Sequence, residues 1–544
     1  MMLRMLIWVF VFCGSVFAES DPPKPTERQQ MDALVELMHY VRQNYYEETN
    51  TVDLLHGAIE GYVSQLDPHS TYIRPDELHD TQERLRGSFE GIGIFFEIVD
   101  NVLTVLSPIE GSPAFRAGLL PGDQIYRIDG KSALNLKTKD VTDMLKGTKG
   151  TQVIVSVRRE GEQDLIDFDI VRDKIEVPSV PYAFMLSDAI GYVKVTRFSA
   201  RTGEELETAI GDLLLQGSQK LILDLRGNGG GYLEQAVVVA NQFIEKGRRL
   251  VYTEGRYRQS RQNHLGQREP IFAPDLPLIV LVDRFSASAS EIVAGAIQDY
   301  DRGLVVGHTT FGKGLVQKQF HLKNQGAVLL TIARYFTPSG RPIQRSFGQD
   351  REAYQKEGYD DYDPNSDPDS LASKKVYHTR ILKRKVFGGG GITPDVPIDA
   401  DTLGTFARVL VKPNNFSTFL SFAKRQEAHM LQQYSDFDSF FKSYEPGPRE
   451  LAEFRSLLKE KALSFTEFEF QETVPFIKKQ IKQQIAQIRW GNWAEGRVRV
   501  QQDLQVSQAI ALFGQAEKLL VARANQQGDA QTYERSQTPY NQVR

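Results

Sequence analysis

The sequence predicts a multidomain α/β protein with helical regions at both ends. Its 544 residues are too many for one ordinary domain and favour roughly three or four. Residues 174–400 alternate buried β-rich runs with helical stretches, which is typical of an α/β core. Apolar residues follow a helical period before residue 86, change to short strands and turns over 86–173, and become helical again after 401.

The composition indicates a soluble globular chain. Apolar residues make up 41% and charged residues 25%, which allows sizeable cores. The net charge is -5, and the sequence holds neither a basic run nor a Cys/His cluster with zinc-binding spacing. We therefore expect no nucleic-acid partner.

Residues 1–18 have the pattern of a secretory signal peptide. Arg4 is their only charged side chain, and residues 5–12 are an unbroken apolar run. A transmembrane anchor is the alternative, but it needs about 20 apolar residues, and Glu19 arrives too early. We expect an exported protein of a bacterial periplasm or cell envelope, with no integral membrane span after signal cleavage.

The single cysteine, Cys13, lies inside this signal segment. A lipoprotein signal would place a small residue before the cysteine, but Phe12 stands there. The mature chain would then carry no thiol, which excludes disulfides and cysteine catalysis.

Residues 19–85 are predicted to form a small helical region. Residues 66–70, Leu-Asp-Pro-His-Ser, interrupt its helical pattern with a turn. We interpret His69 as a structural residue of this turn.

Residues 86–173 read as short strands and turns around a helix near 139–145. This segment resembles a PDZ domain, both in the loop Gly91, Ile92, Gly93 and Ile94 and in the Ala-Gly-Leu-x-Pro-Gly-Asp stretch at 117–123. Glycines let backbone N–H groups converge on a terminal carboxylate while the next strand pairs with a peptide. A simple hairpin would explain the loop alone, but the downstream stretch favours binding of a protein C-terminus.

Three alternating serines, Ser286, Ser288 and Ser290, follow a buried strand at 278–282. Ser288 and Glu291 have the spacing of a capping box, so Ser288 is expected at a helix N-terminus. Backbone N–H groups and the helix dipole favour negative charge there. The alternative is that all three serines are caps or packing residues.

Lys313 follows Ser288 after twenty-five residues and lies between two glycines. On a strand, Lys313, Leu315 and Gln317 would point to one side, where the Gln317 amide can accept a hydrogen bond from the lysine amine. A lysine can serve as the base of a serine hydrolase only if its surroundings lower its pKa from about 10.4. Taken alone, Lys313 would be interpreted as a solvated surface lysine.

A glycine run, 227–231, follows the buried strand 220–225. It does not match a dinucleotide-binding loop, because Tyr232 stands where the last glycine is needed, and it lacks the Lys-Ser/Thr of a P-loop. Its better use is an oxyanion hole, in which a glycine N–H points into the same space as the N–H of Ala289.

Together these motifs resemble the carboxyl-terminal processing peptidases, also called tail-specific proteases. The resemblance covers roughly residues 30–400 and rests on segments 224–231, 286–292, 311–317, 335–340 and 388–396. It implies a catalytic core similar to the crotonase and Clp protease fold, with an inserted PDZ-like domain. One departure is Gly229, where many relatives have another residue, often proline.

By position, the resemblance implies that Ser288 is the nucleophile, Lys313 the general base and Gln317 the residue that orients it. Gly230 and Ala289 would supply the oxyanion donors. No metal or organic cofactor is implied. Residues 361–367 only partly match a calcium loop, because Ser366 replaces the required glycine, and a solvated acidic insertion is the better interpretation.

The predicted function is an exported serine endopeptidase that recognises protein C-termini through its PDZ domain. A PDZ scaffold or chaperone on an inactive hydrolase fold is the alternative, and an amidase or esterase would leave the PDZ-like segment without a purpose. An adaptor protein or a homo-oligomer stays open as a further partner. The expected organisation is a signal peptide (1–18), a helical region (19–85), a PDZ domain (86–173), a peptidase core (174–400), a helical region (401–524) and a disordered tail (525–544).

Overall fold

The computed structural model describes residues 25–99, 101–159, 161–348, 354, 374–399 and 402–528. The predicted signal peptide, the acidic segment 361–367 and the tail from residue 529 lie outside these residues. The chain divides into two units, Met1–Gln65 and Leu66–Arg544, and each is described by itself.

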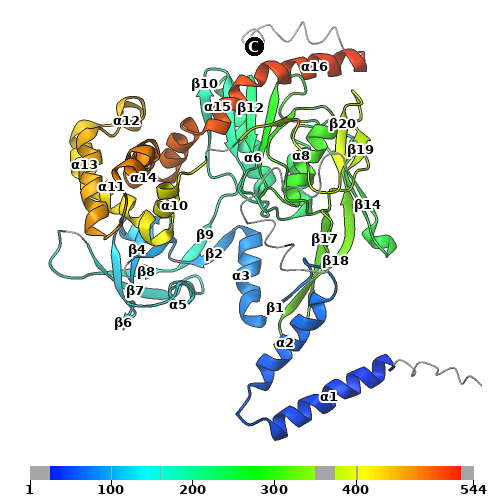
Figure 1. The fold of residues 1–544 in the computed structure, drawn as a ribbon, viewed down its shortest axis with the longest axis horizontal. Coiled ribbons are helices and arrows are strands. Elements are labelled where there is room, and N and C mark those ends of the chain that lie inside the picture. The colour runs from blue at the N-terminus through cyan, green and yellow to red at the C-terminus, as the bar shows by residue number, and fades with distance from the viewer. Residues whose placement is uncertain are drawn as a thin grey trace, which may run out of the picture. The chain divides into compact units, whose positions relative to one another are not determined.

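The first unit contains two helices, α1 (Glu27–Asn44) and α2 (Thr51–Ser64), drawn in dark blue in Figure 1. Thr26 caps α1 through a capping box with Gln29, and the Asn50 side chain caps α2. No residue of α1 is buried. Within the described residues, no helix combines the length and apolar character needed to cross a bilayer.

The second unit begins with a turn that leads into strand β1 (Thr71–Ile73) and helix α3 (Pro75–Arg86). We expected residues 19–85 to be helical apart from the turn at 66–70, and β1, directly after that turn, corrects this. The strand pairs antiparallel with β18 (Ala327–Phe336), opposite Leu329 to Ala327. Three residues show no periodicity, so only the pairing with a strand far along the chain reveals β1.

The PDZ segment is built on a sheet with strand order β3-β4-β5-β7-β8, in which β6 also pairs with β5. Strand β3 lies at the sheet edge, and β2 and β9 form a separate ladder at the base of the segment. Its core is mainly aliphatic and includes Ile92, Val105, Ile125, Val141 and Val155. The elements are β2 (Ser88–Gly91), β3 (Ile94–Val99), β4 (Val102–Pro108), α4 (Pro113–Ala117), β5 (Gln124–Ile128), β6 (Lys131–Ser132), α5 (Thr138–Leu145), β7 (Gln152–Arg158), β8 (Ile166–Val171) and β9 (Asp173–Glu176).

A six-stranded sheet of order β10-β11-β12-β15-β16-β21 forms the centre of the α/β core. All neighbouring strands from β11 to β21 are parallel, and β10 is antiparallel at one edge. The strands are β10 (Ala183–Ser187), β11 (Ile190–Lys194), β12 (Lys220–Asp224), β15 (Leu278–Val282), β16 (Leu304–Gly307) and β21 (Val396–Pro397). The predicted strands at 220–225 and 278–282 match β12 and β15.

Helices cover both faces of this sheet. Leu221 and Leu223 of β12 pack in one core with helices α6 (Thr202–Leu215), α7 (Leu233–Ala240) and α8 (Ala289–Asp299). Ile222, between them, packs on the other face with α15 (Leu504–Ala511) and α16 (Phe513–Gln527). The alternation is the period of two expected of a strand buried on both faces. The last two helices therefore complete the core, although the sequence suggested a separate region at 401–524 (Figure 1).

A second sheet, of order β1-β18-β13-β14, lies beside this core, and β17 (Leu315–His321) also pairs with β18. Its other strands are β13 (Arg249–Glu254) and β14 (Gln262–Leu265), with the 3-10 turn η1 (Arg258–Ser260) between them and a nearby hairpin of β19 (Lys375–His378) and β20 (Lys385–Gly388). Lys313 lies just before β17, and the register shifts between Val316 and Gln317. We had expected Lys313 and Gln317 to share a face of one regular strand. This expectation was wrong, because Lys313 precedes the strand and the strand is irregular before Gln317.

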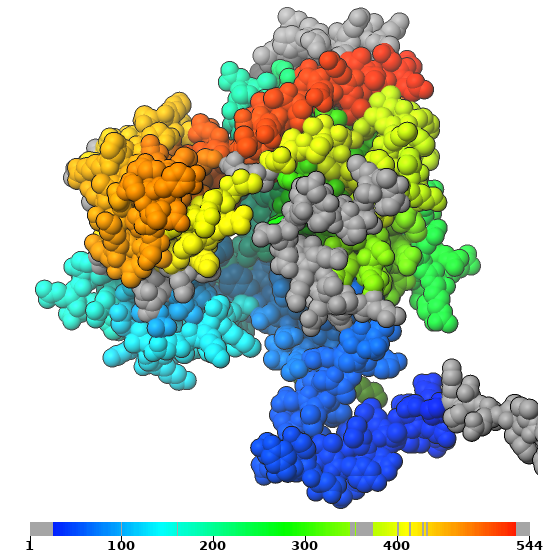
Figure 2. All heavy atoms as spheres, viewed as in Figure 1, coloured from blue at the N-terminus to red at the C-terminus, as the bar shows by residue number. Residues whose placement is uncertain are grey.

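Five further helices form a compact aromatic cluster after residue 404. Phe419, Phe440 and Phe454 are fully buried in it, and Trp490 packs against it. The helices are α10 (Thr405–Leu410), α11 (Pro413–Gln433), α12 (Phe437–Ser443), α13 (Pro448–Glu460) and α14 (Glu467–Gln501), with a break in α14 at Gly491. Figure 2 shows this group, in yellow and orange, on the side of the molecule that also carries the cyan PDZ segment.

Candidate active site

The three alternating serines have different partners. Ser286 Oγ donates to the Leu225 carbonyl at 2.9 Å, and Ser290 Oγ donates to the Asn228 carbonyl at 2.8 Å. Both side chains are fully buried. Ser288 is half-buried, and its hydroxyl makes no capping hydrogen bond to α8. Of the three, Ser288 alone keeps its hydroxyl free for chemistry.

Ser288 is held in a backbone conformation that a serine rarely adopts. It is the N-cap of α8 with φ 55° and ψ -110°. A positive φ outside glycine costs of order 1–3 kcal/mol and persists only where neighbours impose it. The predicted capping box forms by half, because Glu291 Oε2 accepts from Ser288 N at 2.8 Å while the Ser288 hydroxyl does not cap the helix.

The buried carboxylate of Glu291 joins the serine segment to the lysine segment. Besides Ser288 N, it accepts from Lys313 N at 2.9 Å, Gly312 N at 2.7 Å and Thr310 Oγ1 at 2.6 Å. Burial raises the pKa of Glu291, although these donors stabilise its charged form. One side chain therefore fixes the backbone at both Ser288 and Lys313.

Tyr335 makes a second bridge on the carbonyl side of the same two residues. Its hydroxyl donates to the Ser288 carbonyl at 2.9 Å and also contacts the Lys313 carbonyl. The side chain is buried, and burial raises the pKa of its phenol well above the usual value. Ser288 and Lys313 are thus tied together through their N–H groups by Glu291 and through their carbonyls by Tyr335.

The Lys313 amine is oriented by Gln317. Lys313 Nζ donates to Gln317 Oε1 at 2.7 Å, and Gln317 Nε2 donates to the His69 carbonyl at 2.5 Å. Burial lowers the pKa of Lys313, against the opposing charges of Glu291 and Asp67. A lowered pKa provides the neutral amine that a general base requires.

The turn at 66–70 is fixed by its own aspartate. Asp67 accepts from His69 N and Ser70 N, both at 2.8 Å, and from Ser70 Oγ at 2.6 Å. Thr331 Oγ1 of β18 donates to Asp67 at 3.2 Å. Burial opposes the charge of Asp67, but these hydrogen bonds outweigh it and lower the pKa. As expected, His69 is a turn residue, and its backbone carbonyl is the part that reaches the Gln317 amide.

The glycine loop 227–231 packs directly against Ser288. A side chain at Gly230, which has φ 101°, would place its Cβ 2.8 Å from Ser288 Cβ and 3.1 Å from Ala289 N. Gly230 N–H donates to Asn228 Oδ1 at 2.9 Å, so in this conformation it faces its own loop. Ala289 is the first residue of α8, and its N–H is one of the helix donors without an intrahelical acceptor.

Asp283 fastens the glycine loop to the serine segment. Its carboxylate accepts from Gly227 N at 3.0 Å, and from Phe285 N at 3.0 Å and Ser286 N at 2.9 Å. The Asn228 carbonyl accepts from Ala287 N at 3.0 Å. These hydrogen bonds link the glycine loop to the serine segment.

The PDZ loop lies at the start of an edge strand. Gly91 ends β2, Ile92 is buried in the PDZ core, and Ile94 begins β3. Gly93 has φ 80°, and a Cβ there would lie 2.4 Å from Ser112 Cβ, so only glycine fits. An edge strand with a tight glycine loop at its start is the arrangement expected for strand addition by a peptide.

A pocket of about 610 Å³ lies next to the lysine segment. Its walls include Leu315 of β17, Thr331 and Ala333 of β18, and Asp67 of the turn. Leu315, in its wall, is two residues along the chain from Lys313. In the described ranges no group of three or more His, Cys, Asp or Glu side chains has the arrangement of a metal site.

Sequence reasoning did not assign roles to Tyr335, Asp283 or Asp67. Tyr335 and Asp67 were noticed only as parts of longer motifs, and Glu291 only as a capping residue. The sequence gives one signal for these residues, which is that each is a polar residue next to a predicted buried strand or turn.

The α/β core ties a serine with a free hydroxyl to a half-buried lysine, and the chain also carries a PDZ segment. This combination defines a serine hydrolase acting on peptides. Comparison with known proteins agrees. The model of peptidase family S41 matches residues 189–352, a PDZ domain model matches 104–159, and a family of unknown function (DUF8443) matches 409–491.

The carboxy-terminal-processing protease of Bartonella bacilliformis is 38% identical over 320 residues, which cover 58% of this chain and 73% of that protein. The carboxy-terminal processing protease CtpA of Bacillus subtilis is 37% identical over 321 residues, which cover 59% of this chain and 68% of that protein. Among solved structures, the photosystem II D1 C-terminal processing protease is 28% identical, with a TM-score of 0.35 over 69% of this chain and 90% of that one.

The chain therefore belongs to peptidase family S41 and is a serine endopeptidase of the carboxy-terminal processing type with a PDZ domain. These relatives do not favour the alternative of an inactive scaffold or chaperone.

Proposed function

We propose that Ser288 is the nucleophile of this endopeptidase, that Lys313 is its general base, and that Gln317 orients the base. The observation that carries this assignment is the difference between the surroundings of the Ser288 hydroxyl and those of the Lys313 amine. The Ser288 hydroxyl has been left without a structural partner, whereas Lys313 is half-buried and its amine is held by one neutral amide.

In this proposal, neutral Lys313 takes the proton of the Ser288 hydroxyl as its oxygen attacks the substrate carbonyl. Lys313 returns the proton to the leaving amine and then activates the water that hydrolyses the acyl-enzyme. A neutral amide such as Gln317 can accept from the lysine without adding the negative charge that would raise its pKa.

Ala289 N–H and Gly230 N–H are the proposed oxyanion donors. Ala289 is supported by its place at the N-terminus of α8, where donors and the helix dipole favour an oxyanion. Gly230 would first have to exchange its bond to Asn228 Oδ1 for one to the substrate. A glycine at Gly230 and the neighbouring Gly229 give the loop the freedom for that turn.

The PDZ segment is proposed to bind the C-terminus of the substrate. Residues 91–94 would surround the carboxylate with backbone N–H groups, and the peptide would pair with the free edge of β3. A substrate with an amidated or extended C-terminus is therefore expected to be cut more slowly than the same substrate with a free one. Equal cleavage rates would show that the PDZ segment does not recognise the C-terminus of the substrate.

The assignment of the dyad is tested on an unstructured protein substrate. Ser288→Ala and Lys313→Ala should each lose cleavage while the far-ultraviolet circular dichroism and Tm stay near those of the parent. Lys318→Ala, on the exposed side of β17, is the matched control and should cleave normally. Full activity in either active-site variant would reject the dyad.

We further propose that the protein is exported, with signal cleavage near residue 18, and works in a bacterial periplasm or cell envelope. The apolar run at 5–12 supports this. Mass spectrometry of the N-terminus of protein recovered from a cell envelope fraction tests it, and an intact Met1 would argue against it.

A partner is proposed for the first two helices, either an adaptor protein or a second copy of the chain. They expose an unusual number of large apolar side chains, among them Met31, Val35, Leu37, Val52 and Tyr62. Light scattering of the full chain, with Val35→Glu as a variant, separates a homo-oligomer from a monomer that needs an adaptor.

A further inference from the structure

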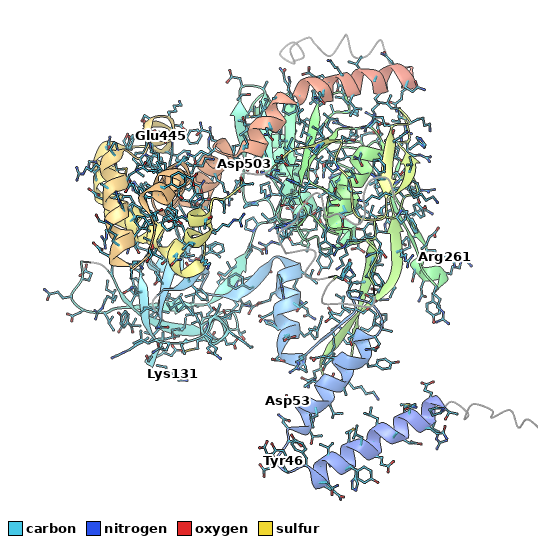
Figure 3. All side chains as sticks on the ribbon, viewed as in Figure 1. Tyr46, Asp53, Lys131, Arg261, Glu445 and Asp503 are labelled. Atoms are coloured by element: carbon cyan, nitrogen blue, oxygen red, sulfur yellow. The ribbon has the colours of Figure 1, made fainter. Side chains whose placement is uncertain are left out.

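Arg226 stands at the entrance to the glycine loop and joins it to the C-terminal helices. Its Nε and Nη2 donate to Asp224, the last residue of β12, at 3.0 and 2.6 Å. Its Nη1 donates to Asp503 at 3.2 Å and to Gln505 at 2.8 Å, and Nη2 lies 2.9 Å from the second Asp503 oxygen. The guanidinium is therefore shared between the catalytic sheet and the start of α15. Figure 3 labels Asp503 at this junction.

Asp503 balances a buried group of charges. Lys194 Nζ donates to Asp224 at 3.0 Å and to the Arg226 carbonyl at 2.5 Å. The group therefore has two positive and two negative side chains, namely Lys194, Arg226, Asp224 and Asp503. The Asp224 side chain is 1% exposed and that of Arg226 is 14% exposed. Without Asp503, Arg226 would lose one of its two carboxylate partners, which is costly in a low-dielectric interior.

The residue after Arg226 begins the loop that touches the nucleophile. Gly227 N–H is held by Asp283, and the Asn228 carbonyl is held by Ala287 N–H and Ser290 Oγ. Gly230 then packs against Ser288. A shift of Arg226 therefore reaches the proposed oxyanion donor through only four residues of chain.

We propose that Asp503 is a positioning residue for the glycine loop, and that the C-terminal helices thereby take part in setting the oxyanion hole. This rests on the proposed function of Ser288 and Gly230. Asp503 touches no reacting atom. It acts by fixing the Arg226 guanidinium, so its loss should lower the rate of chemistry more than the affinity for substrate.

Asp503 also has a purely structural role, because it is the N-cap of α15 and accepts from Val506 N at 3.0 Å. The two roles can be separated by substitution. Serine caps a helix about as well as aspartate but carries no charge for Arg226. Asp503→Ser therefore keeps the cap and removes the ion pair, and Asp503→Asn does the same with nearly the original shape.

The matched control is a second contact between the C-terminal helices and the segment that runs from β12 to Arg226. Glu517 of α16 forms an ion pair with Lys220 of β12 at 2.6 Å, at the end of β12 opposite to the glycine loop. Glu517→Gln removes one acidic charge at this second contact, away from Arg226. It should leave kcat unchanged if the effect of Asp503 is specific to the loop.

The experiment uses the full-length chain, an unstructured protein substrate and a serine-directed phosphonofluoridate. We expect Asp503→Ser and Asp503→Asn to lower kcat and the labelling rate about tenfold, with KM within about twofold. Tm should stay within a few degrees of the parent, and Asp503→Glu should recover part of the rate. Glu517→Gln should behave as the parent.

Parental kcat in both Asp503 variants, an equal loss in Glu517→Gln, or a fall in Tm that accounts for the lost activity would each overturn the inference. Ser288→Ala is measured alongside. If that variant still cleaves, the proposed function fails. If it is inactive while the Asp503 variants are fully active, only the role of Asp503 fails.

Discussion

The carboxylate of Glu291 accepts a hydrogen bond from the backbone N–H of Ser288 at 2.8 Å. The same oxygen accepts from Lys313 N, so the two residues of the proposed dyad share one buried anchor although they come from different segments. Because Ser288 holds a positive φ, this anchor opposes relaxation of the backbone into an ordinary conformation.

Glu291→Gln should therefore cost both activity and stability. A glutamine offers one acceptor oxygen where the carboxylate has two, and its NH₂ group would face N–H donors. Leaving such groups unsatisfied in a buried site costs about 2–4 kcal/mol. We expect a fall in the free energy of urea unfolding of that size and a loss of cleavage of at least about a hundredfold. Glu234→Gln, in the first turn of α7 and exposed, should change neither.

The pH dependence of cleavage should report the base. Since the pKa of Lys313 is lowered from 10.5, its amine becomes neutral, and thus active as a base, at a lower pH than an ordinary lysine. Activity should rise with pH through that lowered pKa and fall as the amine becomes protonated at lower pH. Gln317→Glu places a negative charge 2.7 Å from the amine, which raises its pKa. The acidic limb of kcat/KM should move by about one pH unit or more to higher pH.

Gln319→Glu controls for an added carboxylate on the same strand, because Gln319 contacts His321 and not Lys313. Its pH profile should overlay that of the parent. An unshifted profile in Gln317→Glu would mean that Lys313 is not the titrating base.

Asp67→Asn should loosen the turn that holds the Gln317 amide. The folded-state pKa of Asp67 is lowered, so its contribution to stability is present above the unfolded pKa of about 3.8 and disappears as pH falls through the folded value. At pH 7 we expect unfolding free energy to fall by about 1–3 kcal/mol, with a several-fold loss of kcat. Urea titrations at decreasing pH should show the two proteins converging, and a constant difference would assign the effect to something other than ionisation.

Gly93→Ala should impair binding of protein C-termini. The added Cβ would meet Ser112 at 2.4 Å, so the loop must move. Gly130→Ala is the control, because Gly130 also has a positive φ (75°) but has open space at the Cβ position. Calorimetry with a peptide carrying a free C-terminus should give at least about tenfold weaker binding for Gly93→Ala only. Equal weakening by both variants would indicate general strain in the PDZ segment.

Much of the fold was predictable from local pattern. The strands 220–225 and 278–282 and the helices around 203–215 and 292–297 carry long apolar runs whose period decides their type. The short strand β1 and the place of α15 and α16 were not predictable, because both depend on partners far along the chain. Helix α16 also continues to Gln527, three residues into the segment that composition marked as tail.

The site was predictable to a similar extent. Motif spacing indicated Ser288, Lys313 and Gln317, but it could not tell that Gly230 N–H would face Asn228 or that Asp503 would reach Arg226. Neither a hydrogen bond within one irregular loop nor one between residues hundreds of positions apart leaves a periodic signal in one sequence. Their partners become visible only when the fold brings them together.

The most direct test of the proposed dyad is covalent labelling with a phosphonofluoridate, followed by peptide mapping of the full-length protein. The account predicts one labelled peptide, modified at Ser288, and labelling at least about a hundredfold slower in Lys313→Ala, while Lys318→Ala labels at the parental rate. Modification of a different serine, or equal labelling with and without Lys313, would contradict it.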